Sequence, residues 1–206
     1  MQTSKDAKIH LSLLTFFIII FIWSAINPHD YFTWFLEVFP AVIVIIALIF
    51  TYNKFRFSNL VYLLVFIHAA ILLIGGHYTY AEVPLFNWIK DYFELARNHY
   101  DRLGHFAQGV IPVILLREIL IRKNVVKNKK WLFFILIAIV MFISASYELL
   151  EFGVAKTTGS AADAFLGTQG DVFDTDWDMF FALIGGLTAL LTISKIHDKS
   201  IEKLKS

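Results

Sequence analysis

The stretch WLFFILIAIVMFISASYELLEF, residues 131–152, decides the fold, because it is long enough to cross a bilayer and carries no charge before Glu148. A hydrocarbon core about 30 Å thick needs about 20 predominantly apolar residues in an α-helix. Only helices and closed β-barrels satisfy their backbone hydrogen bonds inside lipid, and this run lacks the alternation of a barrel strand. The stretch therefore predicts a transmembrane helix that ends in carboxylates.

Five further apolar stretches share this character, so the sequence predicts an all-α, polytopic membrane helical bundle. The chain has 206 residues, of which 58% are hydrophobic, and it has no cysteine, which excludes disulfides and thiolate metal sites. No polar stretch is long enough for a separate soluble domain, so we expect a single integral membrane domain over residues 1–206. About six transmembrane helices are predicted, near residues 11–26, 34–52, 60–74, 103–121, 131–152 and 177–194.

The first apolar stretch follows Lys5 and Lys8, as the hydrophobic region of a signal peptide would. The residues after it, Trp23-Ser-Ala-Ile-Asn-Pro28, lack a small-x-small cleavage site, so we interpret it as a retained helix. Two polar connections have their own character. The segment 84–99 predicts a short interfacial helix with aromatic anchors, and the segment 153–176 predicts a re-entrant turn or a short helix.

The distribution of charge predicts the orientation. Lysine and arginine concentrate at both termini and in the second and fourth connections, which the positive-inside rule places in the cytoplasm. An even number of spans also puts both termini on one side. We therefore expect a bacterial plasma (inner) membrane protein with both termini cytoplasmic and membrane lipids as its surroundings. The basic patches flank spans, so they predict topology and no nucleic-acid partner.

Acidic residues and histidines gather on the opposite side, and the fourth span begins with one such group. Asp101 and His105 are four residues apart, so on a helix they share a face with Gln108. Asp101 alone is explained as a helix cap at the positive end of the helix dipole. That alternative leaves His105, about one turn further in, unexplained.

A second group, Glu148 and Glu151, lies three residues apart at the outer end of the fifth span. A carboxylate in hydrocarbon costs roughly 2.5 kcal/mol at a helix centre, so such residues usually face a cavity and a partner. The alternative is a structural ion pair with Arg97 or Arg102.

A third group comprises Asp171, Asp174 and Asp178, whose spacing of three and four allows one helical face to carry them all. Its alternative is a solvated acidic helix start. His77 follows Gly75-Gly76 at the end of the third span, where a lone histidine beside tyrosines is more often hydrogen-bonded structure than a ligand.

Three groups from separate spans end on the same side, which predicts an outward-facing polar pocket. Histidine with carboxylates suits Zn²⁺, Mn²⁺ or Fe²⁺, and carboxylates alone suit Mg²⁺ or Ca²⁺, so one divalent metal ion is the predicted cofactor. The predicted roles are catalytic for Asp101, His105, Glu148 and Glu151, metal-binding for His105, Glu148, Glu151, Asp171, Asp174 and Asp178, and substrate-binding for Arg97, Arg102, His77 and His99.

At these residues the sequence resembles the YjdF-like family of bacterial inner-membrane proteins. The resemblance covers nearly the whole chain and implies a membrane protein without a defined reaction. The matching stretches are Gly75-Gly-His-Tyr-Thr-Tyr80, Arg97-Asn-His-Tyr-Asp-Arg-Leu-Gly-His105, Tyr147-Glu-Leu-Leu-Glu151, Leu166-Gly-Thr-Gln-Gly-Asp171 and Asp174 to Met179.

A more distant resemblance is to VanZ-like membrane proteins, whose pattern is Asp-Lys-x-x-His, then Glu-x-x-Gln, then an Asp that begins a glycine-containing last span. Glu151 stands where that family has Gln, and Met179 stands where its Asn usually follows. The resemblance implies a cell-envelope role. The positions that match the pattern are Asp101, Arg102, His105, Glu148, Glu151, Asp178, Gly185 and Gly186.

Three functions remain open from the sequence. The first is a metal- or acid/base-assisted hydrolase or transferase on a lipid-linked or cell-envelope substrate, with the arginines as phosphate clamps. The second is a non-enzymatic, VanZ-like accessory protein. The third is an ion-binding transporter, which the isolated polar residues His68, Gln108 and Ser144 support poorly. Gly185-Gly186 permits close helix packing within or between chains, and the oligomeric state stays open.

Overall fold

The computed structural model describes residues 2–159 and 163–204. All regular structure in these residues is helical, and six helices there are long and apolar enough to cross a membrane, which confirms the predicted fold class. The last of the six is continuous through a π-helical turn. The spanning helices are α1 (Gln2–Ser24), α2 (Tyr31–Thr51), α3 (Asn59–Tyr78), α5 (Tyr100–Arg122), α6 (Lys129–Thr158) and the succession α8 (Asp174–Thr188), η3 (Ala189–Ile193) and α9 (Ser194–Glu202).

Every predicted span overlaps one of these helices, but the helices are mostly longer than the apolar runs. A helix can continue into polar residues where protein or the membrane interface surrounds it. The hydropathy of the sequence does not detect that extension. The largest differences are at the start of α1 at Gln2 and at the end of α9 at Glu202, and α6 also continues beyond its predicted end, to Thr158. As a result, Glu151 lies well inside a helix instead of at its end.

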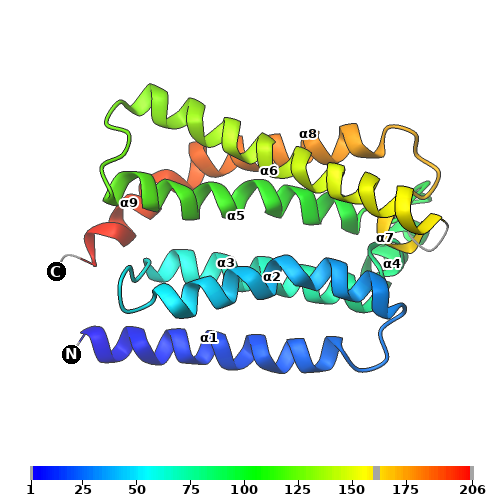
Figure 1. Ribbon diagram of the computed structural model, residues 1–206, viewed down its shortest axis with the longest axis horizontal. Helices are drawn as coiled ribbons and strands as arrows, with labels where there is room; N and C mark the ends of the chain where they lie inside the picture. Colours follow the sequence, from blue (N-terminus) through cyan, green and yellow to red (C-terminus); the bar gives the residue numbers. More distant parts are fainter. Residues whose placement is uncertain (1, 160–162, 205–206) are drawn as a thin grey trace.

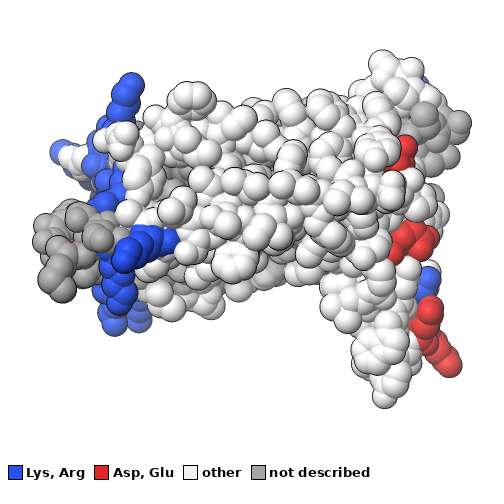
Figure 2. Space-filling model, turned by 90° about the horizontal axis from the view of Figure 1, so that it is seen from below, with Lys and Arg blue, Asp and Glu red and all other residues white. Residues whose placement is uncertain are grey.

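The helices form two groups that face each other (Figure 1). α2 and α1 pack against α3, while α6 and α8 pack against α5, and the contact of α3 with α5 joins the two groups. Both termini lie at one end of the bundle. Figure 2 shows lysine and arginine gathered at that end and acidic residues at the other, so we call them the basic end and the acidic end.

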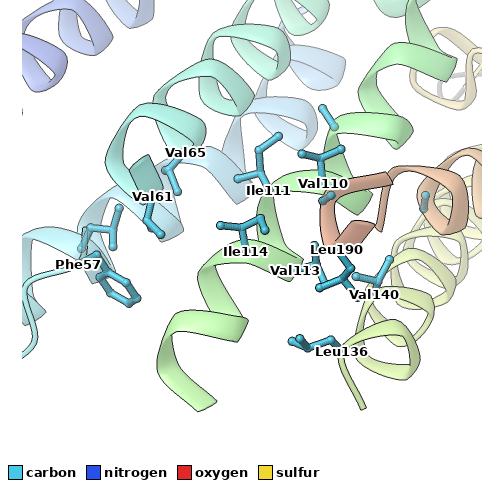
Figure 3. Close-up of a cluster of buried hydrophobic side chains, with 14 residues drawn as sticks. Phe57, Val61, Val65, Val110, Ile111, Val113, Ile114, Leu136, Val140 and Leu190 are labelled. Carbon is cyan, nitrogen blue, oxygen red and sulfur yellow. The ribbon is translucent and has the colours of Figure 1, made fainter. Parts of the chain in front are cut away.

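A hydrophobic core fills the space between the two groups (Figure 3). Val61 and Val65 of α3 point toward Ile114 of α5, and the opposite side of α5 meets Leu136 and Val140 of α6. All five side chains are buried. α5 is thus the central helix of the bundle, and residues at its beginning can meet side chains from both groups.

Two glycines bring α5 and α8 into backbone contact. A Cβ atom at Gly109 would overlap the carbonyl group of Ala182, and one at Gly185 would overlap the carbonyl group of Phe106. Small residues allow this close approach between membrane helices. The contact between these glycines and the facing helix fixes the depth of α8 relative to α5. It thereby fixes the relative positions of His105, about one turn from Gly109, and Asp178, about two turns from Gly185, both nearer the acidic end.

Replacing Gly185 with alanine is therefore expected to destabilise the protein by about 1–3 kcal/mol, since the added methyl forces the two backbones apart. Thermal unfolding in detergent, followed by tryptophan fluorescence, measures the change. Gly153→Ala in α6 is the matched control, because a Cβ there meets nothing within 4 Å. Equal losses from both substitutions would mean that the contact between α5 and α8 is not tightly packed.

Two short elements lie in the predicted polar connections at the acidic end. α4 (Pro84–Tyr92) follows the 3-10 turn η1 (Tyr80–Glu82), and its Trp88 and Tyr92 are exposed, which fits the predicted interfacial helix. Residues 93–99 are not part of that helix. The second predicted segment, 153–176, contains the one-turn helix α7 (Asp163–Leu166), and its residues 160–162 lie outside the described residues.

Candidate functional site

Two buried arginines tie the start of α8 to the start of α5. Arg97 Nη1 lies 2.6 Å from Asp174 Oδ1, and Arg102 Nη2 lies 2.7 Å from the same oxygen. Arg102 Nη1 also pairs with Asp178, and both arginines lie within 3.4 Å of Asp171. Asp174 and Asp178 are buried, so the alternative of a solvated acidic helix start is wrong for these two.

The loop before α8 is also held beside the start of α5, by two hydrogen bonds between the Gln169 side chain and the Asn98 backbone. Gln169 Oε1 accepts from the backbone N–H of Asn98 at 2.9 Å, and Gln169 Nε2 donates to the Asn98 carbonyl at 2.9 Å. The Asn98 side chain in turn donates to Asn87 of α4 and to the Val83 carbonyl. Positive φ angles at Gln169 (49°) and Gly170 (84°) provide the turn that this loop requires.

His105 lies at the centre of the acidic residues. Its Nε2 is 3.4 Å from Asp101 Oδ1 and 3.7 Å from Asp178 Oδ1, and its Nδ1 is 4.0 Å from Glu148 Oε1. Two sets of three side chains offer ligand atoms within 4.8 Å of one another, one formed by Asp101, His105 and Asp178 and the other by His105, Glu148 and Glu151. We call these five residues the His105 cluster.

Several polar atoms of the His105 cluster are buried without a hydrogen-bond partner in the described residues. They are His105 Nδ1, Asp101 Oδ2 and Glu148 Oε1. Buried polar groups without partners are costly, by about 1–3 kcal/mol each and more when charged, so they are rare in folded proteins. His105 Nδ1 and Glu148 Oε1 lie 4.0 Å apart with Glu151 within reach, whereas Asp101 Oδ2 lies 3.6 Å from Arg97 and from Arg102. An imidazole with two carboxylates is a donor set that suits a divalent metal ion.

A second buried glutamate, Glu118 in α5 near the basic end, shows the contrast. Its Oε1 accepts from the Ser58 N–H and from Arg122, each at 2.8 Å. Its Oε2 accepts from the Ser58 hydroxyl at 2.6 Å and lies 3.0 Å from His197 Nε2. Both carboxylate oxygens of Glu118 therefore have hydrogen-bond partners, and a structural role accounts for this residue. Glu148, by contrast, has one oxygen without a hydrogen-bond partner.

The sequence analysis missed Glu37, which α2 places beside the His105 cluster. Glu37 is 3% exposed, and it accepts a hydrogen bond from the Tyr147 hydroxyl at 3.2 Å and another from Tyr80. The ring of Tyr80 occupies the space that side chains at Gly75 and Gly104 would fill, and its burial raises the pKa of its phenol well above the usual value. The sequence did offer one signal for this residue, because Glu37 is a single carboxylate inside a predicted apolar span.

A cavity of about 310 Å³ begins at the His105 cluster and runs into the bundle between α2, α3, α5 and α6. His105, Tyr80 and Tyr147 line it near the acidic end, and Gln108 and His68 line it further in. These last two residues are therefore not isolated, as the sequence suggested. Apolar side chains line the rest, among them Val44, Val65, Ile111, Leu115 and Leu116.

The alternatives raised for single residues can now be decided. α5 begins at Tyr100 with His99 as its N-cap, so Asp101 is not the cap. Ion pairs of Arg97 and Arg102 within the described residues involve aspartates only, so the proposed pairing of Glu148 and Glu151 with these arginines is wrong.

The predicted site residues therefore fall into three sets. The His105 cluster contains all four predicted catalytic residues together with Asp178. Asp171 and Asp174, predicted as metal ligands, are held by Arg97 and Arg102, whose substrate-binding roles stay predictions like theirs.

His77 and His99 lie apart from this arrangement. His77 packs against Trp23 of α1, and its Nδ1 is 3.1 Å from the Ser24 carbonyl oxygen, as the hydrogen-bonded alternative predicted. His99 is exposed before α5, where partial burial and the charges of Arg97 and Arg102 lower its pKa below the usual value. Their substrate-binding roles also stay predictions.

Comparison with known proteins places the whole chain in a membrane family. Residues 9–199 match the family described as "Predicted membrane protein (DUF2238)". The chain is 42% identical over 202 residues to a protein named "Inner membrane protein YjdF" from Escherichia coli (strain K12), an alignment that covers 98% of this chain and 96% of that relative. No solved structure matches the chain significantly.

Proposed function

Since this chain belongs to the DUF2238 family and is a multi-pass inner-membrane protein, we propose that its His105 cluster binds one divalent metal ion for catalysis. The reaction that this site supports best is hydrolysis of, or group transfer from, a lipid-linked or cell-envelope substrate. The proposal rests on one observation above all. Buried atoms of His105 and Glu148, which come from two helices, have no hydrogen-bond partner and lie 4.0 Å apart, with Glu151 within reach of both.

The chemistry of the cluster supports a metal. Asp101, Asp178, Glu148 and Glu151 put four carboxylates around one imidazole, and carboxylates so close together repel one another when charged. A divalent cation would remove that repulsion, activate a water molecule and polarise a phosphoryl or carbonyl oxygen. Carboxylates that are not ligands could then take up a proton from that water.

Arg97 and Arg102 support the cluster by positioning it. Both guanidinium groups are buried and bound to aspartates, so we propose that they orient Asp101 and Asp178 beside His105. Arginine suits this role, because its fixed, planar set of donors holds carboxylates in defined directions. Binding a substrate phosphate would require it to displace an aspartate from one of these pairs.

The charge distribution supports an outward-facing site. The positive-inside rule places the basic end, which carries both termini, in the cytoplasm. The acidic end with the His105 cluster would then face the extracytoplasmic side, where envelope substrates are found. The alternative of an ion-binding transporter is less well supported, because the cavity ends among apolar side chains such as Leu115 and Leu116.

The metal content of the purified protein tests the proposal. After exposure to Zn²⁺ or Mn²⁺ and removal of free ions, we expect about one bound ion per chain by elemental mass spectrometry, since the cluster has ligands for one ion. Asp91→Asn, which changes an exposed acid at the same end, should leave that ratio unchanged. Protein that retains neither ion at neutral pH would rule out the metal site.

A further inference from the structure

The cavity beneath the His105 cluster changes in character with depth. His105 and the phenols of Tyr80 and Tyr147 line it nearest the acidic end, and on α5 Gln108 follows His105 by three residues, which is about 4.5 Å along a helix. His68 of α3 lines the same region. Beyond them the lining is apolar, from Val44 of α2 to Leu115 and Leu116 of α5. The lining therefore changes from imidazole and phenol groups, through the amide of Gln108, to hydrocarbon.

This change from polar to apolar groups matches the order of groups in a membrane phospholipid, from phosphate through glycerol esters to an acyl chain. We propose that the cavity binds one acyl chain of a phosphoglyceride, with the lipid phosphate at the His105 cluster. The phosphate part rests on the proposed function, because carboxylates repel a phosphate unless a metal ion stands between them. The acyl-chain part rests on the cavity alone.

Two prolines support the polar middle layer. Pro112 in α5 and Pro40 in α2 both line the cavity, and a proline inside a helix removes the hydrogen bond to the carbonyl four residues earlier. At Pro112 that carbonyl belongs to Gln108, whose side-chain Oε1 is also buried without a partner. Gln108 therefore offers two open acceptors to a hydroxyl of the glycerol unit, and its amide N–H groups can donate to an ester oxygen.

The helix packing leaves a route from the bilayer. α2 packs on α3, and α6 packs on α5 and α8, so the cavity lies where the two helix groups face each other. Val44 and Ile143 line it from α2 and α6, while their neighbours Ile43 and Phe142 are exposed to the surrounding lipid. A chain can enter sideways between these helices. Apolar cavities of this kind stay dry and take hydrocarbon ligands.

Photolabelling tests the inference. The whole protein is reconstituted in vesicles that contain phosphatidylglycerol with a diazirine at the middle of one acyl chain. We expect crosslinks on the residues of α2 and α5 that line the cavity, which are Pro40, Ala41, Val44, Ile111, Pro112, Leu115 and Leu116. Val44→Phe fills the cavity and should lower these crosslinks roughly tenfold, the change that corresponds to about 1.4 kcal/mol of lost chain burial.

Ile43→Phe is the matched control, because the adjacent side chain faces lipid and should leave the cavity crosslinks unchanged. Crosslinks spread evenly over exposed faces such as Ile18–Ile22, and insensitive to Val44→Phe, would overturn the inference. The metal content of Val44→Phe should equal that of the unsubstituted protein. A bound metal without cavity labelling refutes the acyl-chain site alone, whereas cavity labelling without metal supports the site and refutes the proposed metal centre.

Discussion

Replacing Arg102 with methionine is expected to lower the free energy of unfolding by about 3–5 kcal/mol, the usual loss when one partner of a buried ion pair is removed. Arg102 is bound by Asp174 and Asp178, and all three side chains are buried. Without the guanidinium group, Asp178 stays buried without an arginine, and Asp174 keeps only its pair with Arg97. For a protein of this size the loss corresponds to about 6–20 °C in the thermal midpoint.

Lys90→Met supplies the control, because Lys90 forms a partly exposed pair with Asp91 at 3.9 Å and exposed pairs contribute at most about 1 kcal/mol. Adding Asp178→Asn to Arg102→Met should restore much of the lost stability, since the carboxylate left without an arginine is then removed. A shift for Arg102→Met as small as that of Lys90→Met would contradict the buried arginine–aspartate network.

The substitution Glu148→Gln is expected to act in opposite directions on stability and on metal binding. Glu148 Oε1 has no hydrogen-bond partner, so removing its charge should stabilise the metal-free protein by about 1 kcal/mol, or about 2–4 °C. Loss of an anionic ligand should weaken Zn²⁺ binding by about 100-fold or more. Thermal unfolding without metal and equilibrium titration with Zn²⁺ measure the two effects separately.

Glu118→Gln is the matched comparison, because Glu118 is equally buried but fully hydrogen-bonded. This variant should lose stability and keep its Zn²⁺ affinity. If Glu148→Gln instead destabilised the metal-free protein as Glu118→Gln does, Glu148 would be a structural residue. That result would favour the non-enzymatic accessory protein over the enzyme.

The sequence predicted the helices well because lipid imposes one simple requirement on a spanning segment. Runs such as residues 131–152 need only length and continuous apolarity to be recognised. The sharing of a helix face by Asp101 and His105 also followed from spacing, and the structure confirms that they meet at 3.4 Å. Both inferences depend on local periodicity, which one sequence contains.

What the sequence did not predict depends on contacts between distant segments. Glu37 joins the site from α2 through Tyr147, a pairing across 110 residues that no spacing rule reaches. The division of the acids, with Asp171 and Asp174 bound to arginines and Glu148 left open, likewise required the packing of α8 on α5. The cavity behind His105 arises only when four helices assemble.

The central claim is that His105 and the carboxylates around it form one metal-binding position. Anomalous X-ray scattering from crystals grown with Zn²⁺ tests it most directly, because the signal locates the ion itself. We expect one strong peak within about 2.0–2.2 Å of a His105 ring nitrogen and of carboxylate oxygens from the His105 cluster. Peaks only at the protein surface, with none beside His105, would contradict the claim.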